Sequence, residues 1–285
     1  MRLVLIALLP ACGMGIYQLG WPALRTILIS VAACVGTEAL YEVVNHKRVT
    51  ISDFSAIITG LILAMCLSAH VVWWIPLIGG IFAILIVKQF FGGLGQNIIN
   101  PAMGAKCFLL VFFANQTTIP PGNEETVLSP ILQFLGVGDS VEVLNILFGK
   151  VGDTIGTTSL IALIVGVVLL IWFEVINLYI SGAYLLSLLI FVLLHSGSEL
   201  YWYQSSLDQI FSGSVILAVF FMANDYVTSP VTRKGHLIYG IVLGVLTGVF
   251  CVLGDKPDAI AYAIILSNLL VPIIDKITRP VVFGK

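Results

Sequence analysis

Two adjacent threonine hydroxyls, Thr157 and Thr158, lie in a short polar turn that opens directly into an apolar segment. The stretch over residues 151–175 reads VGDTIGTTSLIALIVGVVLLIWFEV. A hydroxyl at the start of a helix commonly serves as an N-cap, because its oxygen accepts a bond from a free backbone N–H. The same position favours anions, because free N–H groups and the positive end of the helix dipole converge there. The turn therefore predicts either a simple cap or a position for a phosphate.

Two carboxylates, Glu38 and Glu42, are one helical turn apart on one face of an apolar segment. A carboxylate within a membrane is costly and usually faces a partner, a cavity or the interface. Glu42 is expected either to emerge into water beside Lys47 and Arg48 or to take part with Glu38 in ion handling.

Other polar side chains interrupt the apolar pattern at two places. Asn97 and Asn100 offer amide groups within GGLGQNIINPAMGAK (92–106), beside a glycine-rich break. Asp225 lies in FFMANDYVTSPVTRKG (220–235), where a turn rich in hydroxyls follows an apolar segment. Both stretches predict either a binding site for a polar ligand or ordinary capping and turning of the chain.

The cysteines and histidines do not predict a metal centre. The five cysteines are scattered one to an apolar segment with no C-x-x-C spacing, and no histidine lies at a ligand interval from them. We therefore interpret the cysteines as small packing residues.

The composition predicts an all-α polytopic membrane protein. The 285 residues are 59% hydrophobic and 10% charged, with a mean hydropathy of +1.08, far from the range of a water-soluble domain. The apolar runs are long enough to cross the bilayer as helices, whereas a barrel would need short alternating segments. The net charge of −2 and the lack of a basic stripe exclude nucleic-acid partners.

About ten apolar segments predict a single transmembrane domain over residues 1–285, a number that also permits two inverted repeats of five helices. These segments lie near residues 3–19, 21–44, 52–68, 71–90, 98–114, 158–175, 178–194, 208–223, 236–254 and 259–275. Residues 115–157 form the one sizeable loop, in which apolar residues at helical spacing predict an interfacial helix.

The Lys and Arg residues predict the orientation of the chain. With the N-terminus in the cytoplasm, nine of them lie at cytoplasmic ends: Arg2, Lys47, Arg48, Lys88, Arg233, Lys234, Lys276, Arg279 and Lys285. Three lie at the opposite ends, namely Arg25, Lys150 and Lys256. By the positive-inside rule we expect both termini in the cytoplasm, and loop 115–157 with the Thr158 turn on the outer face of the cell membrane.

Several motifs taken together resemble the RnfD and NqrB family of membrane subunits. They are SDFSAIITGLILAMCLS (52–68), GGLGQNIINPAMGAK (92–106), FFMANDYVTSPVTRKG (220–235), NLLVPIIDKITRPVVFGK (268–285) and the GDTIGTTSLIAL turn. They span most of the length in the family's order. NqrB members usually carry a longer N-terminal extension than this sequence has, so the resemblance is closer to RnfD, of the Rnf complex.

The resemblance implies an electron-carrying flavoprotein in a ferredoxin:NAD+ oxidoreductase complex that translocates Na+ or H+. It implies FMN joined by its phosphate to Thr158, because Gly156-Thr157-Thr158-Ser159 looks like the family's G-[ED]-T-S form. Thr157 stands where that form has an acid and is an alternative acceptor. The resemblance also implies a second, noncovalent flavin (riboflavin), a flavin transferase for maturation, and the other membrane and peripheral subunits of the complex as partners.

Three other functions fit the same sequence. The chain could be an NqrB-like subunit of a sodium-pumping NADH:quinone oxidoreductase. Its broken helices and membrane carboxylates would also suit a cofactor-free solute transporter. A purely structural membrane subunit would differ in that Thr158 could be replaced without loss of electron transfer.

Overall fold

The computed structural model describes residues 1–47, 50–117, 154–195, 213–253 and 259–279. Within these ranges the chain is helical, and its one extended contact is an isolated bridge between Ser68 and Thr154. The expected all-α class is confirmed. The expected interfacial helix falls mostly on residues 118–153, which lie outside the described residues and leave it a prediction.

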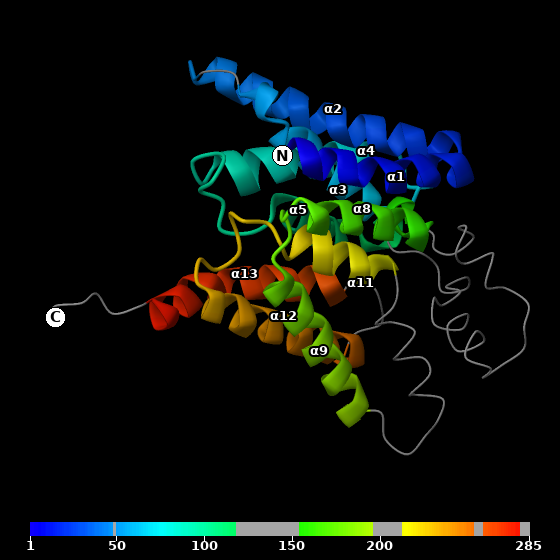
Figure 1. Cartoon of the computed structure of the whole chain (residues 1–285). Helices are drawn as coiled ribbons and strands as arrows, with labels where there is room; N and C mark the ends of the chain where they lie inside the picture. The colour runs from blue at the N-terminus through cyan, green and yellow to red at the C-terminus, as the bar shows by residue number, and fades with distance from the viewer. Residues whose placement is uncertain (48–49, 118–153, 196–212, 254–258, 280–285) are drawn as a thin grey trace, which may run out of the picture.

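The N-terminal half consists of long and short apolar helices in sequence. They are α1 (Arg2–Leu19), α2 (Trp21–Val44), the short η1 (Ile51–Asp53), α3 (Ser55–Met65), α4 (Trp74–Phe82), η2 (Ala83–Gln89) and α5 (Pro101–Thr117). Helix α2 packs on α3 and α4, and α5 packs on α4 and α3. In Figure 1 this half is coloured from blue through cyan to blue-green.

The C-terminal half begins with the turn that carries the two threonines. Its elements are η3 (Ile155–Thr157), α8 (Leu160–Trp172), α9 (Leu178–His195), α11 (Gly213–Leu217), η4 (Ala218–Met222), α12 (Arg233–Leu253) and α13 (Ala259–Thr278). Helix α12 packs between α9 and α13, and α13 also contacts α5 of the first half.

The number of apolar helices agrees with the sequence prediction. Four helices of the described residues are long enough to cross a membrane, and six shorter apolar helices accompany them. The chain is thus a multi-pass membrane protein. The loop predicted over residues 115–157 is shorter than expected at both ends, because α5 continues to Thr117 and η3 already begins at Ile155. The two inverted repeats stay a prediction.

Small residues let α1 and α8 pack closely in antiparallel directions. Gly166 of α8 lies against the carbonyl oxygen of Ala7, and Gly15 of α1 lies against the backbone of Ile155. Because no hydrophobic effect drives helices together in lipid, close backbone contact of this kind supplies much of the packing energy. The pairing fixes the Thr157-Thr158 turn beside the C-terminal part of α1.

Two helices end in π-helical segments, η2 after α4 and η4 after α11. A π-helical segment widens the helix and changes the direction of the side chains that follow, and such segments are frequent at functional sites. Both segments lie on the same side of the molecule, where residues of each contribute to one cavity.

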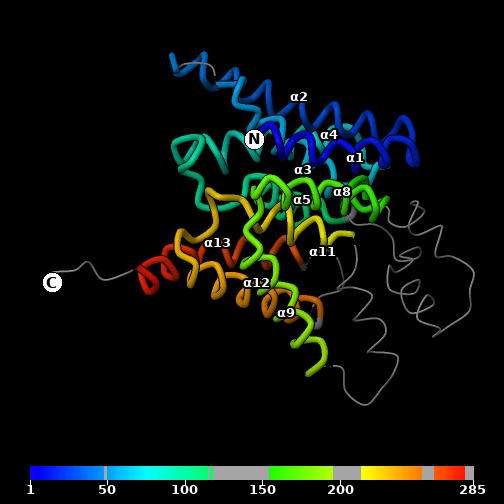
Figure 2. Tube along the Cα trace, in the orientation of Figure 1, coloured from blue at the N-terminus to red at the C-terminus, as the bar shows by residue number. Residues whose placement is uncertain are grey.

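The helix directions bring several chain segments to one end of the molecule. Figure 2 shows the last turns of α2 and α13 on the left of the view and the end of α1 on the right. At the left end, the Thr232 hydroxyl donates to the Thr278 hydroxyl at 2.7 Å, which joins the start of α12 to the end of α13. The Thr158 turn lies at the other end, beside Gly15 of α1.

Candidate functional site

The Thr157-Thr158 turn is a single 3₁₀ turn that precedes α8. The Thr158 hydroxyl donates to the carbonyl oxygen of Ile155 at 3.2 Å, and the residue is only 2% exposed. Thr157 is half-buried, and its hydroxyl lies 2.6 Å from that of Thr154. Thr158 is therefore not accessible in this turn, because its side chain is turned inward to the Ile155 carbonyl.

The N-cap of α8 is Ser159, and neither threonine has this role. The Ser159 hydroxyl oxygen accepts from the N–H of Ala162 at 3.3 Å, and its backbone is extended. The interpretation of Thr157 or Thr158 as the cap is therefore wrong. Their hydroxyls are bound within the preceding turn, so they are not needed to begin the helix.

The turn is held against the rest of the molecule by backbone contacts. The Ile155 N–H donates to the Leu67 carbonyl at 3.1 Å, beside the bridge between Ser68 and Thr154. A Cβ on Gly156 would lie 2.7 Å from the Met65 side chain, so only glycine fits there. Gly156 is thus a packing residue that fixes the position of the turn.

A cavity lies at the other end of α8, between helices of both halves. Its volume is about 90 Å³, and it is partly open to the outside. Its walls are mostly apolar and include Ile58, Ile62, Leu170, Ile176, Phe220 and Phe221. Apolar pockets that are lined by a few polar groups are typical of sites for small molecules and cofactors.

The three polar residues predicted in the two motifs all line this cavity. Asn97 donates from its amide to the Ile99 carbonyl at 3.2 Å. Asn100 uses its side-chain oxygen to accept from the N–H groups of Ala102 and Met103, at 3.1 and 3.3 Å. Asn100 therefore caps α5 and leaves its amide nitrogen for other contacts.

Asp225 lies in the connection between η4 and α12 and also contributes to the cavity wall. Its carboxylate accepts from the N–H of Val227 at 3.3 Å and from the hydroxyl of Thr228 at 3.2 Å. Burial raises the pKa of Asp225, and these two hydrogen bonds oppose the rise. Asp225 therefore both stabilises its turn and lines the cavity, so the two interpretations of this motif, a turn and a site for a polar ligand, apply to it together.

The glycine-rich break that precedes Asn97 is a left-handed loop. Gly93 and Gly95 have φ values of 99° and 86°, which residues with a Cβ rarely adopt. This loop carries Leu94 and Asn97 to the cavity wall. The break thus forms part of the cavity wall.

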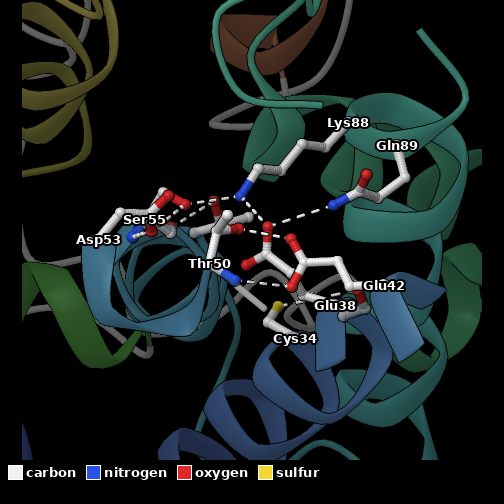
Figure 3. Close-up of polar contacts among 10 residues, drawn as sticks. Cys34, Glu38, Glu42, Thr50, Asp53, Ser55, Lys88 and Gln89 are labelled. Atoms are coloured by element: carbon white, nitrogen blue, oxygen red, sulfur yellow. Dashed lines mark hydrogen bonds and ion pairs between the residues drawn. The ribbon is translucent and has the colours of Figure 1, made fainter. Parts of the chain in front are cut away.

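Glu38 forms a buried ion pair with Lys88 of η2. The Lys88 ammonium lies 2.5 Å from Glu38 Oε1 and donates to the Ser55 hydroxyl at 2.6 Å. The Gln89 amide donates to the same carboxylate oxygen at 3.2 Å. Figure 3 shows Lys88 and Gln89 pointing toward Glu38 from the neighbouring segment. Lys88 and Ser55 also line the cavity, so the pair borders it directly.

Glu42 has a separate set of contacts and does not emerge into water. Its carboxylate accepts from the N–H of Thr50 at 2.9 Å and from the Thr50 hydroxyl at 2.5 Å. The residue is buried, so the solvated interpretation beside Lys47 and Arg48 is wrong. Glu42 closes the loop that leads from α2 to α3.

Lys88 is a site residue that the sequence pattern did not indicate, since it was predicted as one of the charges at cytoplasmic ends. The structure buries it, with 2% of its surface exposed. A signal was present, because a lysine and a glutamate both occur within apolar segments, where a buried charge needs a partner. Their separation of 50 residues hid the pairing.

The Thr158 turn and the cavity lie at opposite ends of α8. The turn directly precedes Leu160, whereas Leu170 and Ile176, near and beyond the end of α8, line the cavity. At 1.5 Å per residue, Thr158 and Leu170 are separated by roughly 18 Å along the helix axis. Two candidate sites are thus connected by one helix.

The helices, the cavity and the buried ion pair together define a multi-pass membrane protein with internal polar sites. Residues 1–284 match the family described as NQR2, RnfD, RnfE. The chain therefore belongs to this family, and the resemblance found in the motifs is confirmed.

Curated relatives match the chain over nearly its whole length. The D subunit of the Na(+)-translocating ferredoxin:NAD(+) oxidoreductase complex of Acetobacterium woodii is 39% identical, covering 100% of this chain and 90% of the relative. The D subunit of the proton-translocating ferredoxin:NAD(+) oxidoreductase complex of Clostridium ljungdahlii is 33% identical, covering 99% and 90%. The D subunit of the ion-translocating oxidoreductase complex of Stutzerimonas stutzeri is also 33% identical, covering 99% and 90%.

Proposed function

We propose that the chain is the D subunit of an ion-translocating ferredoxin:NAD+ oxidoreductase complex, carrying electrons through FMN on Thr158 and contributing to Na+ or H+ translocation. The observation that carries the proposal is the position of two candidate sites at the two ends of α8, in a chain related over its full length to such subunits. The other subunits of the complex are the expected partners.

The Thr158 turn fits a phosphoester in chemistry but requires a side-chain rotation. The Thr158 oxygen would form the ester bond, and the first turn of α8 would face the phosphate with N–H groups that lack intrahelical partners. An ester oxygen cannot donate, so the bond to Ile155 would be lost on attachment. Bound FMN would supply one- and two-electron chemistry at this end of the molecule.

Thr157 is the alternative acceptor of FMN, and its greater solvent exposure favours it over Thr158. Its side chain is half-buried, whereas Thr158 is buried. A flavin transferase must reach the hydroxyl that it modifies, so the motif register and the accessibility favour different residues. The register supports Thr158, because Gly156 and Ser159 stand at the first and last positions of the G-[ED]-T-S form.

The cavity fits the second, noncovalent flavin. Its wall is mostly apolar, and Phe220, Phe221 and Tyr226 provide aromatic surface for a flat ring system. Asn97, Asp225 and Lys88 provide the few polar groups that would orient the ring edges. Riboflavin is the ligand that we propose, since the described residues of the cavity wall include one lysine and one carboxylate but no cluster of cationic side chains for a phosphate.

Glu38 is the carboxylate that we propose for ion coupling. It is buried within α2, borders the cavity through Lys88, and retains one carboxylate oxygen without a partner among the described residues. Glu42 supports this region because its hydrogen bonds to Thr50 fix the position of the segment that leads to Ser55. We also propose that the cavity end faces the cytoplasm and that the Thr158 end faces outward.

Intact-mass spectrometry of the purified chain tests the covalent flavin. The wild-type chain is expected to carry the mass of FMN as a phosphoester, and Thr158→Val to lose it while the protein still inserts. Thr157→Val is the matched control and should retain the mass. Retention in Thr158→Val with loss in Thr157→Val would shift the attachment by one residue. An unmodified wild-type mass, from cells that contain the flavin transferase, would contradict the covalent flavin.

A further inference from the structure

Lys88 lies between the Glu38 carboxylate and the cavity, so its ammonium is within reach of both. Its ammonium contacts the Glu38 carboxylate at 2.5 Å and the Ser55 hydroxyl at 2.6 Å. Both Lys88 and Ser55 form part of the cavity wall. The long, flexible lysine stem lets the charge move while the backbone stays in place. The ammonium can therefore turn from the carboxylate toward the cavity.

The Glu38 carboxylate is only half satisfied by its surroundings. Oε1 accepts from Lys88 and Gln89, whereas Oε2 is buried and has no hydrogen-bond partner among the described residues. The residue is 1% exposed, so bulk solvent does not reach it. A buried carboxylate that loses its one cationic partner must be neutralised by another cation, because an uncompensated buried charge is strongly unfavourable.

The other charged and titratable groups around Glu38 have contacts of their own. The Asp53 carboxylate accepts from the N–H and the hydroxyl of Ser55, both at 2.7 Å. Glu42 is bonded to Thr50, as described above. The thiol of Cys34 donates to the Gly80 carbonyl at 3.7 Å. Figure 3 shows these groups around the pair, and Lys88 is the cation among them.

We propose that Lys88 is a counter-ion shared between Glu38 and the cavity, and that negative charge in the cavity draws it away so that Glu38 takes up one monovalent cation. This inference rests on the proposed binding of a flavin in the cavity. An iron–sulfur carrier of the complex would donate one electron to the flavin. One negative charge is then added in the cavity, Lys88 balances it, and one cation balances the carboxylate.

Because the charges are buried and must be balanced, this exchange sets a stoichiometry of one cation for each electron. The pair is neutral before the electron arrives, and the cluster is neutral again after one cation has bound. If the cation is Na+, no covalent bond forms or breaks; if it is H+, one O–H bond forms on the Glu38 carboxylate. The ammonium keeps its proton in either case. The Ser55 hydroxyl, which contacts Lys88 in the cavity wall, is the natural guide for the movement.

A redox titration tests the inference on the wild-type chain with riboflavin bound. The midpoint potential of the cavity flavin should rise by about 59 mV for each tenfold rise in the coupled cation, if one cation binds for each electron. Titrating NaCl at constant pH and pH at constant NaCl distinguishes Na+ from H+. Glu38→Gln should abolish a dependence on Na+, or reduce a dependence on pH to that of the flavin's own protonation, whereas Glu174→Gln, which removes an exposed carboxylate, should retain the wild-type dependence. A wild-type potential independent of both cations would overturn the inference.

A second experiment needs no flavin. Lys88→Met imitates the state in which the ammonium has left Glu38, so this variant should take up the cation by itself. The readouts are stabilisation by NaCl relative to choline chloride, and the infrared band of a protonated carboxylic acid. Both should disappear in Lys88→Met with Glu38→Gln. Lys88→Gln, which can still bond to Ser55, replaces Lys88→Met if the latter does not fold.

The two experiments separate the inference from the proposed function. If riboflavin does not bind but Lys88→Met takes up a cation at Glu38, the second flavin is wrong and the counter-ion role stands. If riboflavin binds and neither experiment detects cation uptake, the cofactor stands and the counter-ion role is wrong.

Discussion

The Lys88 ammonium of η2 lies 2.5 Å from the Glu38 carboxylate of α2, and both side chains are almost completely buried. Removing either partner leaves a buried charge uncompensated, which typically costs about 3–5 kcal/mol. We expect Glu38→Gln and Lys88→Gln each to lower the unfolding free energy by about this amount. The double variant should lose clearly less than the two single losses combined. Reversible unfolding in detergent, as a double-mutant cycle, measures the coupling, and additive losses would contradict the pairing.

The helix cap at Ser159 gives a prediction that separates folding from flavin attachment. Ser159→Ala removes the oxygen that accepts from the N–H of Ala162, and should lower stability by about 1 kcal/mol. Thr158→Val keeps this cap and should change stability less. The proposed FMN should remain on Ser159→Ala and be absent from Thr158→Val. Thermal unfolding together with intact mass tests both parts. Loss of the flavin from Ser159→Ala at normal expression would assign Ser159 a role in attachment.

A substitution in the cavity wall should weaken riboflavin binding and leave the covalent FMN in place. Val175→Trp places a large ring at the cavity wall and should lower riboflavin affinity at least tenfold without removing the proposed covalent FMN. Val168→Trp is the matched control, because Val168 of α8 is 54% exposed on the outer face of the bundle. Fluorescence quenching of added riboflavin measures the affinity. Equal binding to both variants would place the noncovalent flavin elsewhere.

The raised pKa of Asp225 predicts a stability that falls with rising pH. Since burial raises the pKa in the folded chain above the ordinary value of about 4, the folded state binds more protons than the unfolded state between the two values. Stability is therefore greatest below the unfolded pKa and is lost as pH rises through the folded pKa. Asp225→Asn should remove this part of the dependence. Thermal unfolding of the wild type and of Asp225→Asn, measured in parallel across acidic pH, would reveal any pH dependence of stability that the variant retains.

The proposed orientation predicts opposite labelling of the two ends. Val231→Cys lies in an exposed part of the connection between η4 and α12, at the cavity end, and should be protected from an impermeant maleimide in intact cells. Asn123→Cys, in the loop outside the described residues, should react. Permeabilised cells provide the control in which both positions react. Protection of Asn123→Cys and reaction of Val231→Cys in intact cells would reverse the orientation.

The sequence by itself determined the helical class and the apolar segments. These follow from local properties, because a bilayer requires long apolar runs whose backbone groups pair within each helix. It also identified the threonine turn, Asn97, Asn100 and Asp225, since polar residues and glycine breaks are conspicuous in an apolar chain. The family resemblance rested on the order of these same stretches.

Only the tertiary structure decided how these residues act together. The pairing of Glu38 with Lys88 joins segments 50 residues apart, and the cavity is closed by residues of both halves. The choice of Ser159 as the cap, and the inward rotation of Thr158, depend on how the turn packs against Leu67 and Met65. Burial and partner choice are properties of the packed helices, because a charge or hydroxyl in an apolar interior takes whichever partner the packing brings within reach.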